Sequence, residues 1–310
     1  MGQTAVIFPG QGAQSVGMGR DVAGGSARAR AVFERADELL GFPLSRICFE
    51  GPAGELERTD YQQPAIFVTS VAIWEAMREQ GASLSGFART GGLSLGEYTA
   101  LHVAGAVAFD DALRLVHRRG QLMQHAAGAV ASGMVSLVGA DEASANALCE
   151  EAREDGVLVP ANFNCPGQIV IAGSKDACER AVRLAESFGC KGVPLAVAGA
   201  FHSPIMEPAA AGLMSVLKET PFEVPEIPVI SNVDAEYHGD AERIRSMLAR
   251  QLTHPVRWQR CMERMIADGV GRFIEVGPGR VLSGLMRKIN RQVTAINVST
   301  ADAIPAALAA

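Results

Sequence analysis

Five consecutive residues, Gly92-Leu93-Ser94-Leu95-Gly96, constrain the fold more than any other stretch because they have the form G-x-S-x-G. In this pattern the serine lies on a sharp turn between a strand and a helix. Side chains at the two flanking positions would collide where the backbone doubles back, which explains the glycines. The helix expected over residues 96–106 would direct its N-terminal N–H groups toward developing negative charge. The pattern alone leaves two interpretations open, a nucleophilic serine or a Gly/Ser turn inside a globular domain.

The composition narrows the class of protein. At 310 residues, 48% of them hydrophobic, the chain is long enough for one large domain or two modest ones with a sizeable core. Its net charge of −6 argues against a nucleic-acid partner, which would require clustered Lys and Arg. No apolar run approaches the length of a membrane span, and residues 1–8 lack the features of a signal peptide. We therefore expect neither nucleic acid nor a membrane as a partner.

The cysteine pattern favours the cytoplasm. The chain has six cysteines, none of which form a C-x-x-C pair, and no histidine cluster lies near them at metal-ligand spacing. The simplest interpretation is reduced, mostly buried thiols in a cytoplasmic protein. We accordingly expect no metal site.

In the N-terminal part of the chain, an apolar run at 5–8 predicts a buried strand, which leads into a Gly-rich loop at 9–14. A dinucleotide loop would require glycine at position 15, where Ser15 stands, and no G-K-[ST] follows. Helical spacing predicts helices over 29–40 and 62–80, and a third over 111–125 capped by Asp110.

The middle of the chain has a different pattern of elements. Strands are expected at 134–138, 157–162, 168–172 and 190–197, with helices at 141–154 and 175–188. This order is β-α-β-β-α-β, the ferredoxin-like unit. We therefore predict a small ferredoxin-like domain over 129–198, inserted into a larger one.

After the insertion, strands are expected at 227–231 and 272–276, and a helix over 281–289 follows the second of them. Alternating strands and helices on both sides of the insertion imply a mainly parallel sheet covered by helices. The predicted fold class is α/β, with a large α/β-hydrolase-like domain formed by residues 1–128 and 199–310.

Nine short motifs, taken together, resemble a known family. In chain order they are FPGQGAQ at 8–14, QPA at 63–65, G-x-SLGEYTAL at 92–101, RGQLM at 119–123, N-x-PGQ-x-V at 164–170, AFHSPIM at 200–206, PVISNV at 228–233, QLTHPVRW at 251–258 and EVGPG at 275–279. The chain resembles the malonyl-CoA:acyl carrier protein transacylases and the acyltransferase domains of fatty acid and polyketide synthases. The motifs span nearly the whole chain and keep the order of that family.

The resemblance implies acyl transfer in two halves. Ser94 would attack the thioester of malonyl-CoA, and the phosphopantetheine thiol of acyl carrier protein would then attack the malonyl-serine ester. His202 would be the base that activates the serine, because a hydroxyl is a weak nucleophile without one. The backbone carbonyl of Gln251 would orient the imidazole, and the N–H groups of Gln11 and Leu95 would stabilise the oxyanion.

The resemblance also assigns the substrate pocket. Arg119 would bind the malonyl carboxylate through two parallel hydrogen bonds, while its neighbour Arg118 should be an ordinary surface residue. Phe201 would leave little room for a branch at the α-carbon, and Asn162 would help to shape the acyl pocket. In the family, Phe at the position of Phe201 accompanies malonyl, as does a residue other than Gln at the position of Leu95.

The resemblance further implies a monomer that binds no cofactor, whose partners are a coenzyme A thioester and acyl carrier protein. One position departs from the family pattern, because Leu93 stands where the family has histidine before the serine. Two other classes stay open. One is a serine hydrolase or thioesterase that uses the same nucleophile turn, which would admit water and would not need Arg119. The other is a weakly catalytic docking module, which Leu93 alone suggests. The residues do not distinguish fatty acid from polyketide synthesis.

Overall fold

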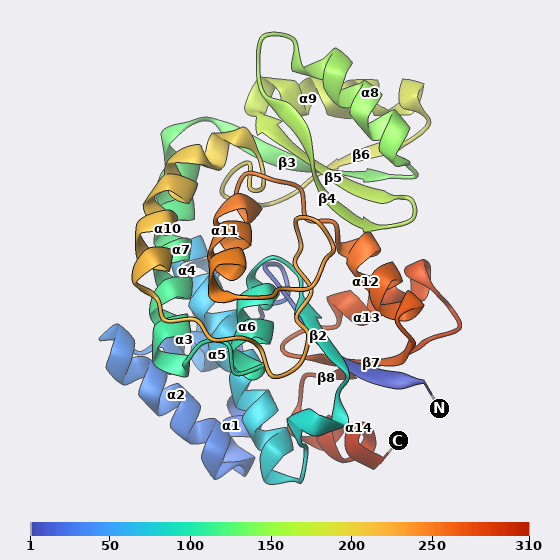
Figure 1. Ribbon diagram of the computed structural model, residues 1–310. Coiled ribbons are helices and arrows are strands. Elements are labelled where there is room, and N and C mark those ends of the chain that lie inside the picture. The colour runs from blue at the N-terminus through green and yellow to red at the C-terminus, as the bar shows by residue number, and fades with distance from the viewer. Residues whose placement is uncertain (1, 310) are drawn as a thin grey trace.

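The computed structural model describes residues 2–309 and contains two four-stranded sheets (Figure 1). The larger unit is built on a parallel sheet in the order β2-β1-β7-β8. Its strands are β1 (Gln3–Phe8), β2 (Arg89–Gly92), β7 (Val270–Val276) and β8 (Thr294–Val298). The α/β class with a parallel sheet is thus confirmed.

Helices cover both faces of this sheet, as the central strand shows. Val6 and Phe8 of β1 belong to a core cluster with residues of α2, α5, α6 and α7, whereas Ala5 and Ile7 belong to a second cluster with residues of α12 and α13. The alternation follows from strand geometry, because successive side chains point to opposite faces. All four side chains are fully buried.

The helices of the large unit come from both sides of the middle segment. Before it lie α1 (Arg20–Gly25), α2 (Ala27–Leu40), α3 (Leu44–Glu50), α4 (Ala53–Leu56), α5 (Thr59–Glu79), α6 (Leu95–Val103) and α7 (Phe109–Ala129). After it lie α10 (Glu207–Glu219), α11 (Ala241–Gln251), α12 (Trp258–Ala267), α13 (Val281–Ile289) and α14 (Ile304–Ala309). The longest, α5 and α7, pack against each other.

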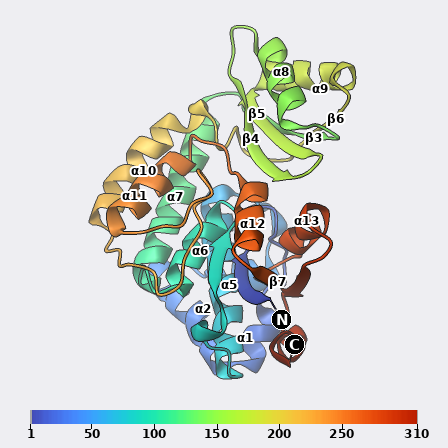
Figure 2. The same ribbon diagram turned by 45° about the vertical axis from the view of Figure 1, so that its right-hand side comes forward.

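The smaller unit lies at the top of both views, away from the two termini (Figures 1 and 2). Its antiparallel sheet has the order β4-β5-β3-β6. The chain runs through β3 (Ser132–Val138), α8 (Glu142–Arg153), β4 (Leu158–Cys165), β5 (Gln168–Ser174), α9 (Lys175–Leu184) and β6 (Lys191–Pro194). A separate core cluster lies between this sheet and its two helices.

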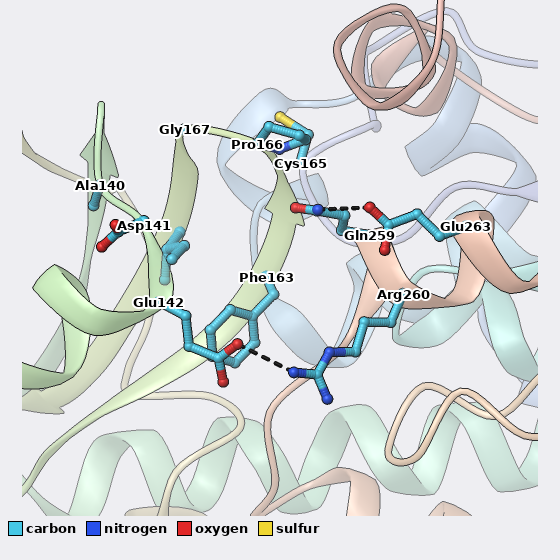
Figure 3. Close-up of a pocket in the computed structure, with 11 residues that line it drawn as sticks. Ala140, Asp141, Glu142, Phe163, Cys165, Pro166, Gly167, Gln259, Arg260 and Glu263 are labelled. Atoms are coloured by element: carbon cyan, nitrogen blue, oxygen red, sulfur yellow. Dashed lines mark hydrogen bonds and ion pairs between the residues drawn. The ribbon is translucent and has the colours of Figure 1, made fainter.

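Contacts distant in sequence join the two units. The backbone N–H of Phe163 donates to the Val256 carbonyl at 2.9 Å, and the N–H of Val256 donates to the Ala161 carbonyl at 2.8 Å. Close by, Arg260 on α12 forms an ion pair with Glu142 on α8 at 3.2 Å. Figure 3 shows this pair beside a pocket of about 410 Å³ that lies where α8, the β4–β5 turn and α12 meet.

Two sequence-based predictions are wrong in detail. Residues 227–231 form only isolated bridges instead of a strand, since Pro228 has no N–H for a ladder and pairing is limited to Thr90 and Tyr237. Asp110 does not cap α7, because the helix begins at Phe109, two residues before the expected start, and Ala108 is the cap residue. Asp110 lies in the first turn instead, where it forms an ion pair with Arg35.

Candidate active site

The turn around Ser94 has the geometry that its glycines predict. Ser94 lies between β2 and α6 with φ 51° and ψ −99°, a conformation rarely adopted by residues other than glycine. A Cβ on Gly92 would lie 2.0 Å from the backbone of Gly96, and one on Gly96 would lie 2.1 Å from the carbonyl oxygen of Phe8. Only glycine fits at either position, so close backbone contacts on both sides fix the tight turn on which the serine lies.

Ser94 and His202 are in hydrogen-bond contact although 108 residues separate them. The Oγ of Ser94 lies 2.9 Å from Nε2 of His202, and Nδ1 of His202 lies 2.6 Å from the backbone oxygen of Gln251. A carbonyl only accepts hydrogen bonds, so Nδ1 carries the proton and Nε2 presents its lone pair to the serine. This arrangement is that of a nucleophile, a base and an orienting group.

Burial sets the protonation state of His202. The side chain is only 4% exposed, and burial together with the nearby charge of Arg119 lowers the pKa of His202 to about 4, against the opposing effect of the Gln251 carbonyl. His202 is therefore neutral at pH 7 and able to accept a proton from Ser94.

Arg119 is a buried cation whose hydrogen-bond partners among the described residues are all neutral. It is 1% exposed and donates to Oε1 of Gln63 at 2.6 Å, to Oγ of Ser94 at 3.0 Å and to Oε1 of Gln251 at 2.9 Å. Within residues 2–309 it has no carboxylate ion-pair partner, and its Nε has no hydrogen-bond acceptor. Burial lowers the pKa of Arg119, the expected response of a desolvated cation. By contrast, Arg118 is exposed.

A pocket of about 190 Å³ opens onto Ser94 and His202. Gln11, Asn162 and Phe201, all assigned to the site from the sequence, line it. Arg119 does not line this pocket and reaches it through its hydrogen bond to Ser94. Most of the remaining lining is apolar and comes from Leu93, Met123, Met134, Val170, Leu195, Val197, Val281 and Leu285.

Backbone donors are also available at the turn. Leu95 is the first residue of α6, so its N–H has no acceptor within the helix. In the part of the chain that the structure describes, neither this N–H nor that of Gln11 makes a hydrogen bond. Both are free to bind an oxyanion.

The sequence model of one family, described as the acyl transferase domain, matches residues 5–307. The chain belongs to this family of acyl transferases. Among curated relatives, the malonyl CoA-acyl carrier protein transacylase of Salmonella typhimurium is 43% identical over 309 residues, covering 99% of both chains. That of Bacillus subtilis is 42% identical over 310 residues, covering 99% of this chain and 97% of the relative.

Solved structures place the acyl transferase in the same family. An acyl carrier protein S-malonyltransferase from Vibrio cholerae superposes with a TM-score of 0.94 at 42% identity, covering 98% of this chain and 99% of the other. A malonyl-transacylase solved in complex with a holo type II polyketide acyl carrier protein gives a TM-score of 0.96 at 40% identity, covering 99% of each chain.

Three contacts in the acyl transferase were not expected from the sequence. Gln63, part of the QPA motif, accepts a hydrogen bond from Arg119, and the side chain of Gln251 accepts a second. Asn232 accepts the backbone N–H of Ser94 at 2.6 Å. Gln63 and Asn232 lie in motifs of the family, and this was the one sign in the sequence that they could belong to the site. Their partners, Arg119 and Ser94, are 56 and 138 residues away in sequence.

Leu93 has a simple structural environment in this acyl transferase. Its side chain is partly buried, packs against the apolar cluster formed with α12 and α13, and lines the pocket beside Ser94.

No helix in residues 2–309 has the length and apolar character needed to span a membrane.

Proposed function

We propose that this protein transfers the malonyl group from malonyl-CoA, through an ester on Ser94, to the phosphopantetheine thiol of acyl carrier protein. The names of its relatives support malonyl as the acyl group and acyl carrier protein as the acceptor. The observation that carries the assignment is a serine–histidine pair at 2.9 Å beside a buried arginine that forms no ion pair within the described residues. The product would supply fatty acid or polyketide synthesis.

In the first half-reaction, Nε2 of His202 takes the proton of Ser94 as Oγ attacks the thioester carbonyl carbon. The resulting oxyanion accepts hydrogen bonds from the N–H groups of Gln11 and Leu95. Each of these hydrogen bonds lowers the activation free energy by about 3–4 kcal/mol. Collapse of the tetrahedral intermediate breaks the carbon–sulfur bond, and His202 returns the proton to the departing thiolate of coenzyme A. The serine then carries the malonyl ester.

In the second half-reaction the same groups act in reverse. His202 accepts the proton of the phosphopantetheine thiol, whose sulfur attacks the ester carbonyl. Ser94 leaves with the proton that His202 returns, and the malonyl thioester is formed. The Gln251 carbonyl keeps the imidazole in one tautomer throughout.

Arg119 explains the choice of an acyl group that carries a charge. A buried cation without a carboxylate in direct contact is costly, and among residues 2–309 the nearby Glu97 reaches Arg119 only through the side chain of Gln251. The Nε–H of Arg119 has no acceptor among these residues and can still donate. A malonyl carboxylate would supply the missing negative charge and accept bidentate hydrogen bonds. An acetyl group would leave the cost uncompensated, so we propose that Arg119 selects dicarboxylic acyl groups.

Intact-protein mass spectrometry after mixing with malonyl-CoA tests the proposal. We expect a malonyl adduct that disappears when phosphopantetheinylated carrier protein is added, with the malonyl group appearing on the carrier. Rapid release of free malonate without carrier protein would indicate a hydrolase instead. Absence of any adduct would favour the docking module that Leu93 suggests.

The reaction of Ser94 should depend on pH with a midpoint near 4. Because the pKa of His202 is lowered to about 4, mainly by burial, the base is neutral above that pH and becomes protonated below it. Phosphonylation of Ser94 by a small fluorophosphonate should therefore be constant from pH 5 to 8 and fall about tenfold per pH unit below 4. Rates are corrected for folded protein by circular dichroism, and a midpoint near 6.5 would contradict this prediction.

Phe201→Ser should shift selectivity toward methylmalonyl-CoA. Phe201 is 4% exposed and lines the pocket beside Ser94, so its ring occupies space that an α-methyl branch would need. Exclusion of one methyl group is worth about 1–3 kcal/mol, so the ratio of kcat/KM for methylmalonyl to malonyl should rise roughly ten- to two-hundredfold. The ratio is taken within each protein, which removes differences in stability. An unchanged ratio would refute the steric role of Phe201.

We also propose that residues 129–198 form an inserted ferredoxin-like domain, and that residues 1–128 and 199–310 form an α/β-hydrolase-like domain. The order of elements from β3 to β6, the sheet order and the separate core support the first assignment. The strand–turn–helix around Ser94 supports the second. A monomeric state, the lack of a bound cofactor and a cytoplasmic location stay predictions.

A further inference from the structure

Glu97 is a fully buried carboxylate three residues after Ser94, on the first turn of α6. It accepts three hydrogen bonds from two distant parts of the chain. Its Oε2 accepts the backbone N–H of Asn232 at 3.0 Å and Nε2 of Gln251 at 2.7 Å, and its Oε1 accepts Nε2 of His238 at 2.7 Å. A buried carboxylate requires such donors to offset its desolvation.

Two of these partners hold the peptide groups of Ser94. The side chain of Asn232 accepts the Ser94 N–H at 2.6 Å and donates to the Gly92 carbonyl at 2.8 Å. The side chain of Gln251 donates to the Ser94 carbonyl at 3.0 Å. Glu97 thus holds the side chain of Gln251 and the backbone of Asn232, the two residues whose side chains brace the turn at Ser94. Ser94 has positive φ, a conformation that persists only where several surrounding contacts enforce it.

Gln251 also connects Glu97 to the rest of the site. Its amide lies between Arg119, which can only donate hydrogen bonds, and the carboxylate of Glu97, which can only accept them. This arrangement fixes which end of the amide is oxygen and which is nitrogen. The backbone carbonyl of the same residue orients His202. One carboxylate is therefore linked, through Gln251, to the nucleophile, the base and the buried arginine.

We propose that Glu97 is a positioning residue for the reaction: it touches no substrate, and it holds Gln251 and Asn232 so that Ser94 and His202 keep their reactive geometry. The inference rests on the proposed function only in taking Ser94 as the nucleophile. Removing Glu97 should slow the chemical step more than it weakens substrate binding, because Arg119 keeps its bond to Gln63.

Two variants and one control test this role. Glu97→Ala should lower kcat for malonyl transfer about 100-fold, the size expected for a misplacement of roughly 1 Å, with KM for malonyl-CoA changed less than about threefold. In Glu97→Gln, kcat should be about tenfold higher than in Glu97→Ala, because the amide oxygen of Gln can accept hydrogen bonds from both Gln251 and Asn232. Thr99→Val is the matched control: Thr99 is fully buried on the same helix and its hydroxyl has no partner in the described chain.

A second readout separates this role from the choice of acyl donor. Phosphonylation of Ser94 by a small fluorophosphonate involves no malonyl-CoA, and its rate should fall in parallel with kcat in both Glu97 variants. All rates are expressed per folded molecule. Rates within threefold of wild type in folded Glu97 variants, or an equal loss in Thr99→Val, would overturn the proposal. If Glu97→Ala does not fold, Glu97→Gln decides: about tenfold slower phosphonylation supports the role, and a wild-type rate refutes it.

Discussion

Ser94→Ala should lower malonyl transfer by about 10³–10⁶-fold and abolish the covalent adduct. The reason is that, in the proposed mechanism, Oγ of Ser94 both attacks the thioester and carries the malonyl group between the two half-reactions. The hydrogen bonds that hold its backbone, from Ser94 N–H to Asn232 and from Gln251 to the Ser94 carbonyl, do not involve the hydroxyl, so the fold should persist.

The measurement is intact-protein mass spectrometry after incubation with malonyl-CoA, followed by a peptide map. Thermal unfolding of Ser94→Ala against wild type controls for folding. A malonyl adduct that persists on the folded variant would show that another residue is the nucleophile.

Arg119→Ala should produce the second large effect, a change of preferred substrate. Truncating one partner of a buried charge pair costs about 2–5 kcal/mol, roughly thirty- to several-thousandfold in kcat/KM for malonyl-CoA. Acetyl-CoA has no carboxylate to leave unpaired, so the kcat/KM for acetyl-CoA should fall far less. The measured quantity is the ratio of kcat/KM for malonyl to acetyl within one protein. This ratio cancels the loss of the hydrogen bond from Arg119 to Ser94, which affects both substrates.

Arg118→Ala is the matched control, because Arg118 is the preceding residue on α7 and is exposed. It should leave the ratio unchanged. A wild-type protein that transfers acetyl as well as malonyl would remove the basis for assigning Arg119 to substrate selection.

The sequence predicts local features of this fold well where one short stretch decides them. The turn at Ser94 follows from glycines whose replacement would place a Cβ about 2 Å from backbone atoms. The elements of the small unit follow from its hydrophobic runs, and its helix α8 (Glu142–Arg153) lies within one residue at each end of the helix expected over 141–154. The strand expected at 227–231 is wrong because that prediction followed the hydrophobic run and disregarded Pro228, which has no N–H to donate to a neighbouring strand.

The chemistry that depends on long-range contacts was only partly predictable. The family pattern named Ser94, His202 and Arg119, and the structure brings them together through hydrogen bonds to Ser94. It gave no role to the side chain of Gln251, which contacts Arg119 and Glu97 from a position more than a hundred residues away in sequence. Periodicity and local spacing carry no information about such pairs, because each partner is also an ordinary buried polar residue.

The backbone conformations of Ser94 and His202 have a consequence for interpreting related sequences. Both have positive φ, 51° and 58°, and such conformations in residues other than glycine cost about 1–3 kcal/mol each. That is a noticeable share of the 5–15 kcal/mol by which domains are typically stable. A descendant that no longer needed the chemistry would gain stability by placing glycine at both positions. Glycine at 94 and 202 in an otherwise similar chain would therefore mark a protein retained for its binding surface after loss of catalysis.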